Sequence, residues 1–476
     1  MDAVPAQGAT ASIVVKQIMS DQEANRLSAR ATRYLRVGAN LSGVAARMAG
    51  ARIMGTSDAR AGNAAALTQA LGGLKGPLMK VAQLLSTIPD ALPAEYAEEL
   101  SKLQSEAPPM GAAFVKRRMI AELGANWQSR FAAFDLKPVA AASLGQVHRA
   151  STLQGAPVAV KLQYPDMASA VEADLSQLEI LFALQRQMDG SIDTRQILKE
   201  IAERVREELD YLREAKHARL YGRILQGNVH VRVPTLHENL STRRLLTLGW
   251  LEGTRLLTYK QAAQEHRNTI ARAMFEAWWS PMLRAGIIHG DPHLGNYTVF
   301  EEDGAPQGIN LLDYGCVRIF PPSFVGGVID LYCGLRDNDE ARIVHAYETW
   351  GFKGLKRELI EVLNIWARFI YGPVFDDRER TIADGVKPGE YGRKEAYQVH
   401  QELKRKGPVT IPREFVFMDR AAIGVGGVLL HLDAKLNFST LFREFIEGFA
   451  VEALAQRQTQ LLDAVGLEPS APKRAS

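Results

Sequence analysis

The sequence predicts an α+β fold with a small β-rich lobe, a large helical lobe and an N-terminal helical extension. Three features support this prediction: a short β-branched strand that ends in Lys161, a loop in which Asn296 follows Asp291 by five positions, and Asp313 in an Asp-Tyr-Gly turn. One carboxylate to orient an attacking oxygen and two oxygen ligands for Mg2+ are what phosphoryl transfer from ATP requires. Together the three features are typical of a protein-kinase-like two-lobed fold.

Bulk composition excludes several classes of protein. The chain of 476 residues has 46% hydrophobic and 23% charged residues, as an ordinary globular protein does. A net charge of +3 is too small to indicate a nucleic-acid partner. The two cysteines provide no disulfide framework, and Met1 to Lys16 lacks the pattern of a secretory signal. The apolar run from Ala421 to Leu432 is too short to span a bilayer. We therefore expect a cytoplasmic protein, with peripheral contact at the inner membrane left open.

The N-terminal region is predicted to hold a mobile tail over residues 1–22, followed by the helical extension over 23–127. Arg26, Arg30 and Arg33 fall on one helical face in a segment without acidic residues. This face is either attracted to an anionic membrane or simply solvated, and surface charge runs more often have the second role. Further helices are expected around the apolar stripe from Leu74 to Ile88, after Pro93, and from Met110 to Leu123.

The small lobe is predicted over residues 128–249. A small-residue turn at Ala140, Ala141, Ala142 and Ser143 leads into a strand, and residues 158–162 form the next strand. Helices are expected over about 168–188 and 194–222, followed by short strands at 231–233 and 245–248. Residues 250–253 are interpreted as the hinge to the large lobe of 250–464, and 465–476 as a polar tail.

Lys161 and a carboxylate partner are the first predicted site residues. In a kinase-like site the ammonium contacts the α- and β-phosphates and is held by an acidic residue from a nearby helix. Several acids compete in the segment Arg206 to Glu214, and we select Glu208, with Asp210 and Glu214 as supporting groups.

The loop from His289 to Asn296 carries the next candidates. Asp291 is predicted to orient the attacking oxygen or accept its proton, and Asn296 and Asp313 to hold the metal. His289 and His293 lack a third zinc ligand at suitable spacing, so both are interpreted as hydrogen-bonding supports of the loop. Gly290 and Gly295 are expected to adopt positive φ.

Nucleotide contacts are expected from the alanine-rich turn and from Glu252 in the hinge. Ser143 is expected to reach phosphate through its hydroxyl or its backbone, and alanine stiffens a loop that glycine would leave flexible. Gln146 lies just past the turn, where nucleotide contact and strand packing explain it about equally well.

Assembled, these motifs resemble the AarF/UbiB/ADCK family of atypical kinase-like proteins over about residues 30–450. The elements that carry the resemblance are Ala-Ala-Ala-Ser-Leu-Gly-Gln-Val-His, Val-Ala-Val-Lys, Glu-Leu-Asp-Tyr, His-Gly-Asp-Pro-His-Leu-Gly-Asn and Asp-Tyr-Gly. The family also has a Lys-x-Gly-Gln motif on an N-terminal helix that folds over the nucleotide site. The corresponding segment here is Lys80-Val81-Ala82-Gln83, with Ala82 in place of glycine. The resemblance implies that Lys80 and Gln83 face the nucleotide.

The resemblance also implies binding of ATP with Mg2+, ATPase-like activity and occlusion of protein substrates by the extension. It further implies a supporting role in isoprenoid quinone (ubiquinone) biosynthesis, with lipid or quinone-biosynthesis proteins as partners. Two alternatives remain at this stage. One is a small-molecule kinase of the aminoglycoside/choline type, which also uses a His-Gly-Asp loop. The other is a non-catalytic, nucleotide-binding lipid regulator.

Overall fold

The computed structural model describes residues 110–142, 144–188, 194–352, 354–387, 391–406 and 413–468. Several expectations fall outside these residues: the tail, the arginine face at 26–33, Lys80, Gln83 and Ser143. They stay predictions.

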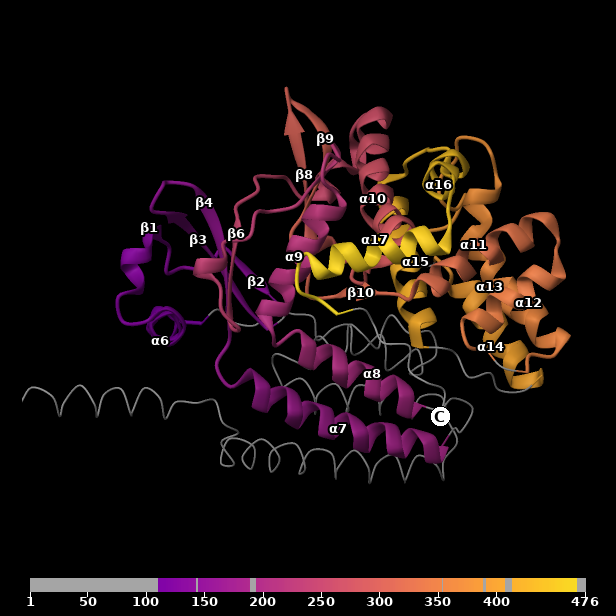
Figure 1. Ribbon diagram of the computed structural model, residues 1–476, viewed down its shortest axis with the longest axis horizontal. Helices are drawn as coiled ribbons and strands as arrows, with labels where there is room; N and C mark the ends of the chain where they lie inside the picture. Colours follow the sequence, from indigo (N-terminus) through magenta and orange to yellow (C-terminus); the bar gives the residue numbers. More distant parts are fainter. Residues whose placement is uncertain are drawn as a thin grey trace, which may run out of the picture.

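A five-stranded antiparallel sheet forms the small lobe (Figure 1). Its strand order is β1-β3-β4-β6, and β2 pairs with β3 beside β1. The strands are β1 (Phe131–Phe134), β2 (Ala140–Ala142), β3 (Gly145–Thr152), β4 (Pro157–Gln163) and β6 (Leu245–Gly249). Lys161 lies in the central strand β4, opposite Val147 of β3 and Leu246 of β6. The predicted strand that carries Lys161 is confirmed. The three alanines, expected as a turn, are instead the strand β2, and the reversal comes after them.

Helix α6 (Ala112–Leu123) packs against this sheet and is followed by the short helix η1 (Trp127–Arg130). Its buried residues share one hydrophobic cluster with the strands, which contains Val115, Met119, Trp127, Phe131 and Val158 among others. Residues 110–127 were expected in the N-terminal extension. The described part of this segment, from Met110 on, instead shares its core with the small lobe.

Three helices follow the first strands: α7 (Met167–Met188), α8 (Thr194–Glu207) and α9 (Tyr211–Ile224). Figure 1 shows α7 and α8 side by side, while α9 lies between the sheet and the large lobe. The single helix predicted over 194–222 is divided between α8 and α9, because Asp210 caps the start of α9. Its side chain accepts hydrogen bonds from the backbone N–H groups of Leu212 and Arg213.

The large lobe contains two small sheets beside a buried helix. Helix α10 (Gln264–Ala285) is buried along most of its length and ends at Gly286, whose φ of 67° lies in the left-handed region. One sheet has the strand order β5-β9-β8, and the other pairs β7 with β10. The strands are β5 (Val231–Arg232), β7 (Ile287–His289), β8 (Tyr297–Glu302), β9 (Ala305–Leu311) and β10 (Val317–Ile319). The short helices η3 (Leu256–Gln261) and η4 (Leu294–Asn296) belong to this lobe, whereas η2 (Glu238–Leu240) contacts β6 of the small lobe.

The remaining helices complete the large lobe around α10. They are α11 (Pro322–Asp337), α12 (Glu340–Thr349), α13 (Arg357–Phe375), α14 (Arg393–Lys406), α15 (Arg413–Leu432), α16 (Phe438–Ile446) and α17 (Val451–Asp463). The apolar run at 421–432 belongs to α15, which packs against α10. Within the described ranges no helix is both long enough and apolar enough to cross a bilayer. Val465 was assigned to the polar tail but is buried at 3% exposure, so the core extends past α17.

Asp419 on α15 provides a test of how burial affects stability. Its Oδ2 atom accepts a hydrogen bond from Trp366 Nε1 at 2.9 Å, and its Oδ1 atom has neither solvent contact nor a hydrogen-bond partner among the described residues. Burial raises the pKa of this carboxyl from 3.8 to about 8, against the opposing effect of the Trp366 bond. The folded state therefore keeps a proton that the unfolded chain loses near its ordinary pKa.

We expect the free energy of unfolding to fall as pH rises from ~4 to ~8, because the folded state binds the extra proton throughout that interval. Asp419→Asn should flatten this slope and stabilise the protein above pH ~8 by roughly 1–3 kcal/mol. Urea unfolding at a series of pH values checks both effects. Equal slopes in the wild type and the variant would contradict the prediction.

Candidate functional site

The site is built around Lys161, which lies between two carboxylates. Its Nζ atom contacts Glu214 Oε1 at 2.7 Å and Glu214 Oε2 at 3.0 Å. The same atom contacts Asp313 Oδ2 at 2.8 Å, although Asp313 is 152 positions away in the chain. The Lys161 side chain is 15% exposed. Glu214, at 4%, is the buried partner of its ammonium, and Asp313, at 28%, is the partner nearer to solvent. The structure thus brings the predicted Lys161 and Asp313 together.

Glu214, and not Glu208, is the carboxylate partner of Lys161, so our prediction was wrong. Asp210 starts a new helix, and Glu214 is four positions further, on a face of α9 that meets β4. Glu208 lies before that helix, where its Oε1 atom accepts a hydrogen bond from Cys316 Sγ at 3.2 Å. The sequence did contain a signal for this choice. Asp is a preferred N-cap residue, so Asp210 could have indicated the start of a new helix that carries Glu214.

The charges in this cluster are unequal, because one ammonium faces two carboxylates. Burial alone lowers the pKa of Lys161, but the attraction of Asp313 and Glu214 outweighs it and raises that pKa well above its usual value. Burial raises the pKa of Glu214 to about 7; Lys161 opposes this shift and Asp313 adds to it. Lys161 is therefore charged, and above pH ~7, where Glu214 is ionised, the cluster carries surplus negative charge that suits a cation at Asp313.

The loop after β7 positions the other two predicted residues. Asp291 is 8% exposed. Its backbone N–H donates to His289 Nδ1 at 3.2 Å, and its carbonyl accepts from Asn296 Nδ2 at 3.0 Å. The other ring nitrogen of His289, Nε2, donates to the Asp313 carbonyl at 2.6 Å. His289 thus links the Asp291 loop to the Asp313 turn, and its predicted supporting role is confirmed. His293 Nδ1 accepts from the Gly295 N–H at 3.1 Å, which also supports the loop.

Gly290 and Gly295 do not adopt positive φ, contrary to our expectation. Gly290 is required for a different reason. A Cβ atom there would lie 2.7 Å from the Cys316 carbonyl oxygen, because Gly290 N–H donates to that same carbonyl at 2.9 Å. The glycine permits close approach of the Asp291 loop to the segment that follows Asp313.

The alanine-rich segment forms a hairpin with the start of β3. Ala140, Ala141 and Ala142 pair with Val147, Gln146 and Gly145 respectively. Gly145 has no room for a side chain, because a Cβ atom would overlap the carbonyl of Leu162 in β4. The hairpin is therefore held tightly to the strand that carries Lys161. Nucleotide contact by the three alanines stays a prediction.

Gln146 has a function in the fold that the sequence did not reveal. Its Oε1 atom accepts from the backbone N–H of Met110 at 2.6 Å, and its Nε2 donates to the Met110 carbonyl at 3.3 Å. Gln146 Nε2 also lies 2.9 Å from His148 Nε2, and His148 Nδ1 lies 2.7 Å from the Asp135 carbonyl. His148 must donate from Nδ1 to this carbonyl, so its Nε2 accepts from Gln146. The hairpin strand therefore binds the chain at Met110, where the described residues begin.

Replacing Gln146 by alanine should destabilise the protein by about 1–3 kcal/mol, since both Met110 backbone groups would be left buried without their partner. Backbone amide exchange at Met110 should accelerate with it. Thermal unfolding and hydrogen exchange measure these effects. Unchanged protection at Met110 would show that the contact contributes nothing to stability. The exposed Gln154→Ala variant, in the turn between β3 and β4, is the matched control.

Glu252 lies in the segment between β6 and η3 that we interpret as the hinge. Its carboxylate is 75% exposed and pairs with Arg149 at 2.9 Å. Its carbonyl accepts from Asn310 Nδ2 at 2.8 Å. A role of Glu252 in nucleotide binding stays a prediction, and the exposed side chain gives it no support.

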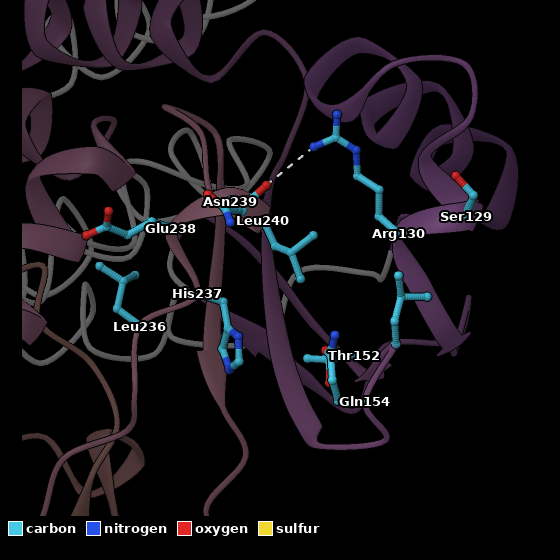
Figure 2. A pocket seen from close by; sticks show the side chains of 10 residues that line it. Ser129, Arg130, Thr152, Gln154, Leu236, His237, Glu238, Asn239 and Leu240 are labelled. Atoms are coloured by element: carbon cyan, nitrogen blue, oxygen red, sulfur yellow. Dashed lines mark hydrogen bonds between the residues drawn. The ribbon is translucent and has the colours of Figure 1, made fainter.

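A separate hollow of about 620 Å³ lies in the small lobe, bounded by the β3–β4 turn and by η1 and η2. Figure 2 shows Arg130 reaching toward Asn239, whose carbonyl accepts from Arg130 Nη1 at 3.3 Å. None of the predicted site residues lines this hollow. We therefore place the candidate site at Lys161, Asp291 and Asp313.

Comparison with known proteins agrees with this geometry. The family model described as the ABC1 atypical kinase-like domain matches residues 102–347, which is more than half of the chain. The chain belongs to this family. The matched region includes Lys161, Glu214, Asp291, Asn296 and Asp313, and the resemblance to AarF/UbiB/ADCK proteins is confirmed.

Two relatives and one solved structure illustrate the similarity. "Protein ACTIVITY OF BC1 COMPLEX KINASE 8, chloroplastic" from Arabidopsis thaliana is 27% identical over 80% of this chain and 53% of its own length. "Atypical kinase COQ8, mitochondrial" from Saccharomyces cerevisiae is 27% identical over 79% of this chain and 75% of its own length. The structure titled "The complex structure of Rv3197-erythromycin from Mycobacterium tuberculosis" is 28% identical, with a TM-score of 0.57 over 85% of this chain and 99% of that one. The chain thus spans about half the length of the chloroplastic relative. The family match and the solved structure together confirm the predicted kinase-like fold.

Proposed function

We propose that this ABC1-family protein binds ATP with Mg2+ and transfers the terminal phosphoryl group to water or to another acceptor. The observation that carries the proposal is the cluster of Lys161 with Glu214 and Asp313, joined through His289 to the loop of Asp291. Catalysis of phosphoryl transfer depends chiefly on positioning and on charge stabilisation, and this cluster has the residue types for both.

The donor set fits magnesium accompanied by phosphates. No group of three or more His, Cys, Asp or Glu side chains suited to a metal ion occurs among the residues that the structure describes. Mg2+ is commonly held by only one or two protein carboxylates together with substrate phosphates. Asp313 has a partly exposed carboxylate. Asn296 uses its Nδ2 atom on the Asp291 carbonyl, so its Oδ1 atom is the candidate ligand. When bound, Mg2+ would neutralise charge on the phosphates.

Each chain residue then has a defined task. The Lys161 ammonium, held by Glu214, would bind phosphate oxygens. The Asp291 carboxylate would orient the attacking hydroxyl and accept its proton. The fixed carbonyl and N–H of Asp291 keep this carboxylate in place relative to Asp313.

The acceptor and the biological role rest on the relatives. The family resemblance, with a relative named COQ8, supports a role in isoprenoid quinone (ubiquinone) biosynthesis, with lipid or quinone-biosynthesis proteins as partners. Peripheral contact with an anionic membrane rests on the sequence of the arginine segment with Arg26, Arg30 and Arg33. The small-molecule kinase alternative is disfavoured by the family match. A non-catalytic lipid regulator is disfavoured because Lys161, Asp291, Asn296 and Asp313 are all present around one site.

Thermal unfolding of the full chain with ATP, with and without Mg2+, tests the nucleotide site. A ligand at about 100 times its dissociation constant should stabilise the folded state by ~2.7 kcal/mol. Absence of any Mg2+-dependent shift would overturn the proposal. Phosphate release, measured beside transfer to added proteins or small molecules, then separates an ATPase from a phosphotransferase.

A further inference from the structure

Two successive peptide groups in the turn at Asp313 accept hydrogen bonds from histidine side chains. In the first, the Asp313 carbonyl accepts from His289 Nε2 at 2.6 Å. The N–H of the same peptide group belongs to Tyr314, and it lies near the Glu214 carboxylate, where it helps to lower the pKa of that group. The first peptide group is thus held by the Asp291 loop on one edge and faces α9 on the other.

The second peptide group joins Tyr314 to Gly315 and controls the Asp313 side chain. Its N–H, from Gly315, donates to Asp313 Oδ1 at 3.0 Å. Its carbonyl, from Tyr314, lies 3.1 Å from His217 Nδ1. Because a peptide group is planar, a bond that fixes the carbonyl also fixes the direction of the N–H. His217 therefore acts on the same rigid unit that orients the Asp313 carboxylate.

The surroundings of His217 determine which of its two ring nitrogens carries the proton and donates a hydrogen bond. Its side chain is 1% exposed, and its Nε2 atom has no hydrogen-bond partner among the described residues. Burial lowers its pKa to about 3, and the charges of Arg213 and Arg318 contribute to the shift. The ring is therefore neutral at physiological pH. Its single proton is on Nδ1, since the Tyr314 carbonyl can only accept.

Helix α9 presents this histidine beside the residue that holds Lys161. Glu214 and His217 are three positions apart, so they share one face of the helix. His217 contacts the carbonyl of Tyr314, and the Glu214 carboxylate lies near the N–H of the same residue. A single helix face thus supplies the partner of the phosphate-binding lysine and the hydrogen bond that fixes the metal-binding turn.

We propose that His217 is a positioning residue, which holds the Tyr314–Gly315 peptide so that the Asp313 carboxylate is oriented for Mg2+. This inference rests on the proposed function. A histidine that merely fills space would affect stability, whereas a positioning histidine sets the Mg2+ concentration that the site requires. Supporting groups of this kind typically change metal affinity or activity by about 10- to 100-fold.

A matched pair of variants isolates the hydrogen bond. In His217→Asn the Nδ2 atom is as many bonds from the backbone as Nδ1 of histidine, so a donor remains. His217→Leu has nearly the same shape as the Asn variant and no donor. For each protein the Mg2+ concentration that gives half of the ATP-dependent thermal shift is measured. Each midpoint compares a protein with itself at different Mg2+ concentrations, so it does not depend on how stable that protein is without ligand.

We expect a midpoint about 10- to 100-fold higher in His217→Leu than in the wild type. The midpoint of His217→Asn should stay near the wild-type value. His345→Leu, at an exposed histidine of α12, should leave it unchanged. Equal midpoints in the Leu variant and the wild type would overturn the inference. Equal increases in the Leu and Asn variants would also overturn it, because the ring and not the donor would then be responsible.

Two further outcomes are decisive. If the wild type shows no Mg2+-dependent shift, the proposed function itself fails, and that result is distinct from a failure at His217. If His217→Leu does not fold, His217→Ala replaces it, and the Asn variant alone also tests the inference. An increase of about tenfold in the Asn midpoint would contradict it.

Discussion

Asp291→Asn should slow phosphoryl transfer by about 10²- to 10⁴-fold while leaving the Mg2+-ATP thermal shift in place. Asparagine has the shape of aspartate, but it cannot accept the proton of an attacking hydroxyl. The fold should tolerate the change, because two hydrogen bonds that hold this residue are made by its backbone and remain in the variant. These are its N–H to His289 and its carbonyl from Asn296.

Phosphate release and acceptor phosphorylation measure this rate, and the thermal shift with Mg2+-ATP measures binding in the same preparation. Asp303→Asn is the matched control. Asp303 is exposed in the turn between β8 and β9 with a φ of 53°, a conformation that asparagine also adopts readily. An unchanged rate in Asp291→Asn would remove Asp291 from its role as proton acceptor. Loss of the thermal shift would mean that Asp291 contributes to binding instead.

The residues that could be predicted from sequence are those that short motifs identify. Lys161 and Asp313 are 152 positions apart, yet both were expected at one site, and their side chains meet at 2.8 Å. The strand of Lys161 could be predicted because β-branched residues and a turn surround it. The supporting role of His289 followed from its place in the loop and from the missing third zinc ligand.

Other parts of the site depend on geometry that composition does not encode. The choice between Glu208 and Glu214 depends on where α9 starts, and a helix boundary decides which face each acid occupies. Gln146 binds the backbone of Met110, and backbone groups are the same at every position, so no pattern could indicate that partner. The same reason concealed His217, whose hydrogen bond goes to a backbone carbonyl, that of Tyr314.

Asp313→Asn should abolish the Mg2+-dependent part of the nucleotide-induced stabilisation, which in the wild type is ~2.7 kcal/mol at about 100 times the dissociation constant. The amide keeps one oxygen but loses the negative charge of the carboxylate, and Asn296 supplies only a second neutral oxygen, so no charged ligand of the proposed pair would remain for Mg2+. The ligand-free protein should remain folded. Two carboxylates share the single ammonium of Lys161, so the variant keeps a balanced pair of Lys161 with Glu214.

The pKa of Glu214 provides an independent check on this variant. The charge of Asp313 contributes to the raised pKa of Glu214, which is about 7 and comes mainly from burial. Removing that charge should lower this pKa, so Glu214 should be ionised at a lower pH in Asp313→Asn. NMR titration of the Glu214 carboxyl measures the change, with Asp303→Asn as the control. A full Mg2+-dependent shift in Asp313→Asn would exclude Asp313 as the metal ligand. An unchanged Glu214 pKa would show that the charges of the two carboxylates do not affect each other. Their combined negative charge would then not explain why a cation binds at Asp313.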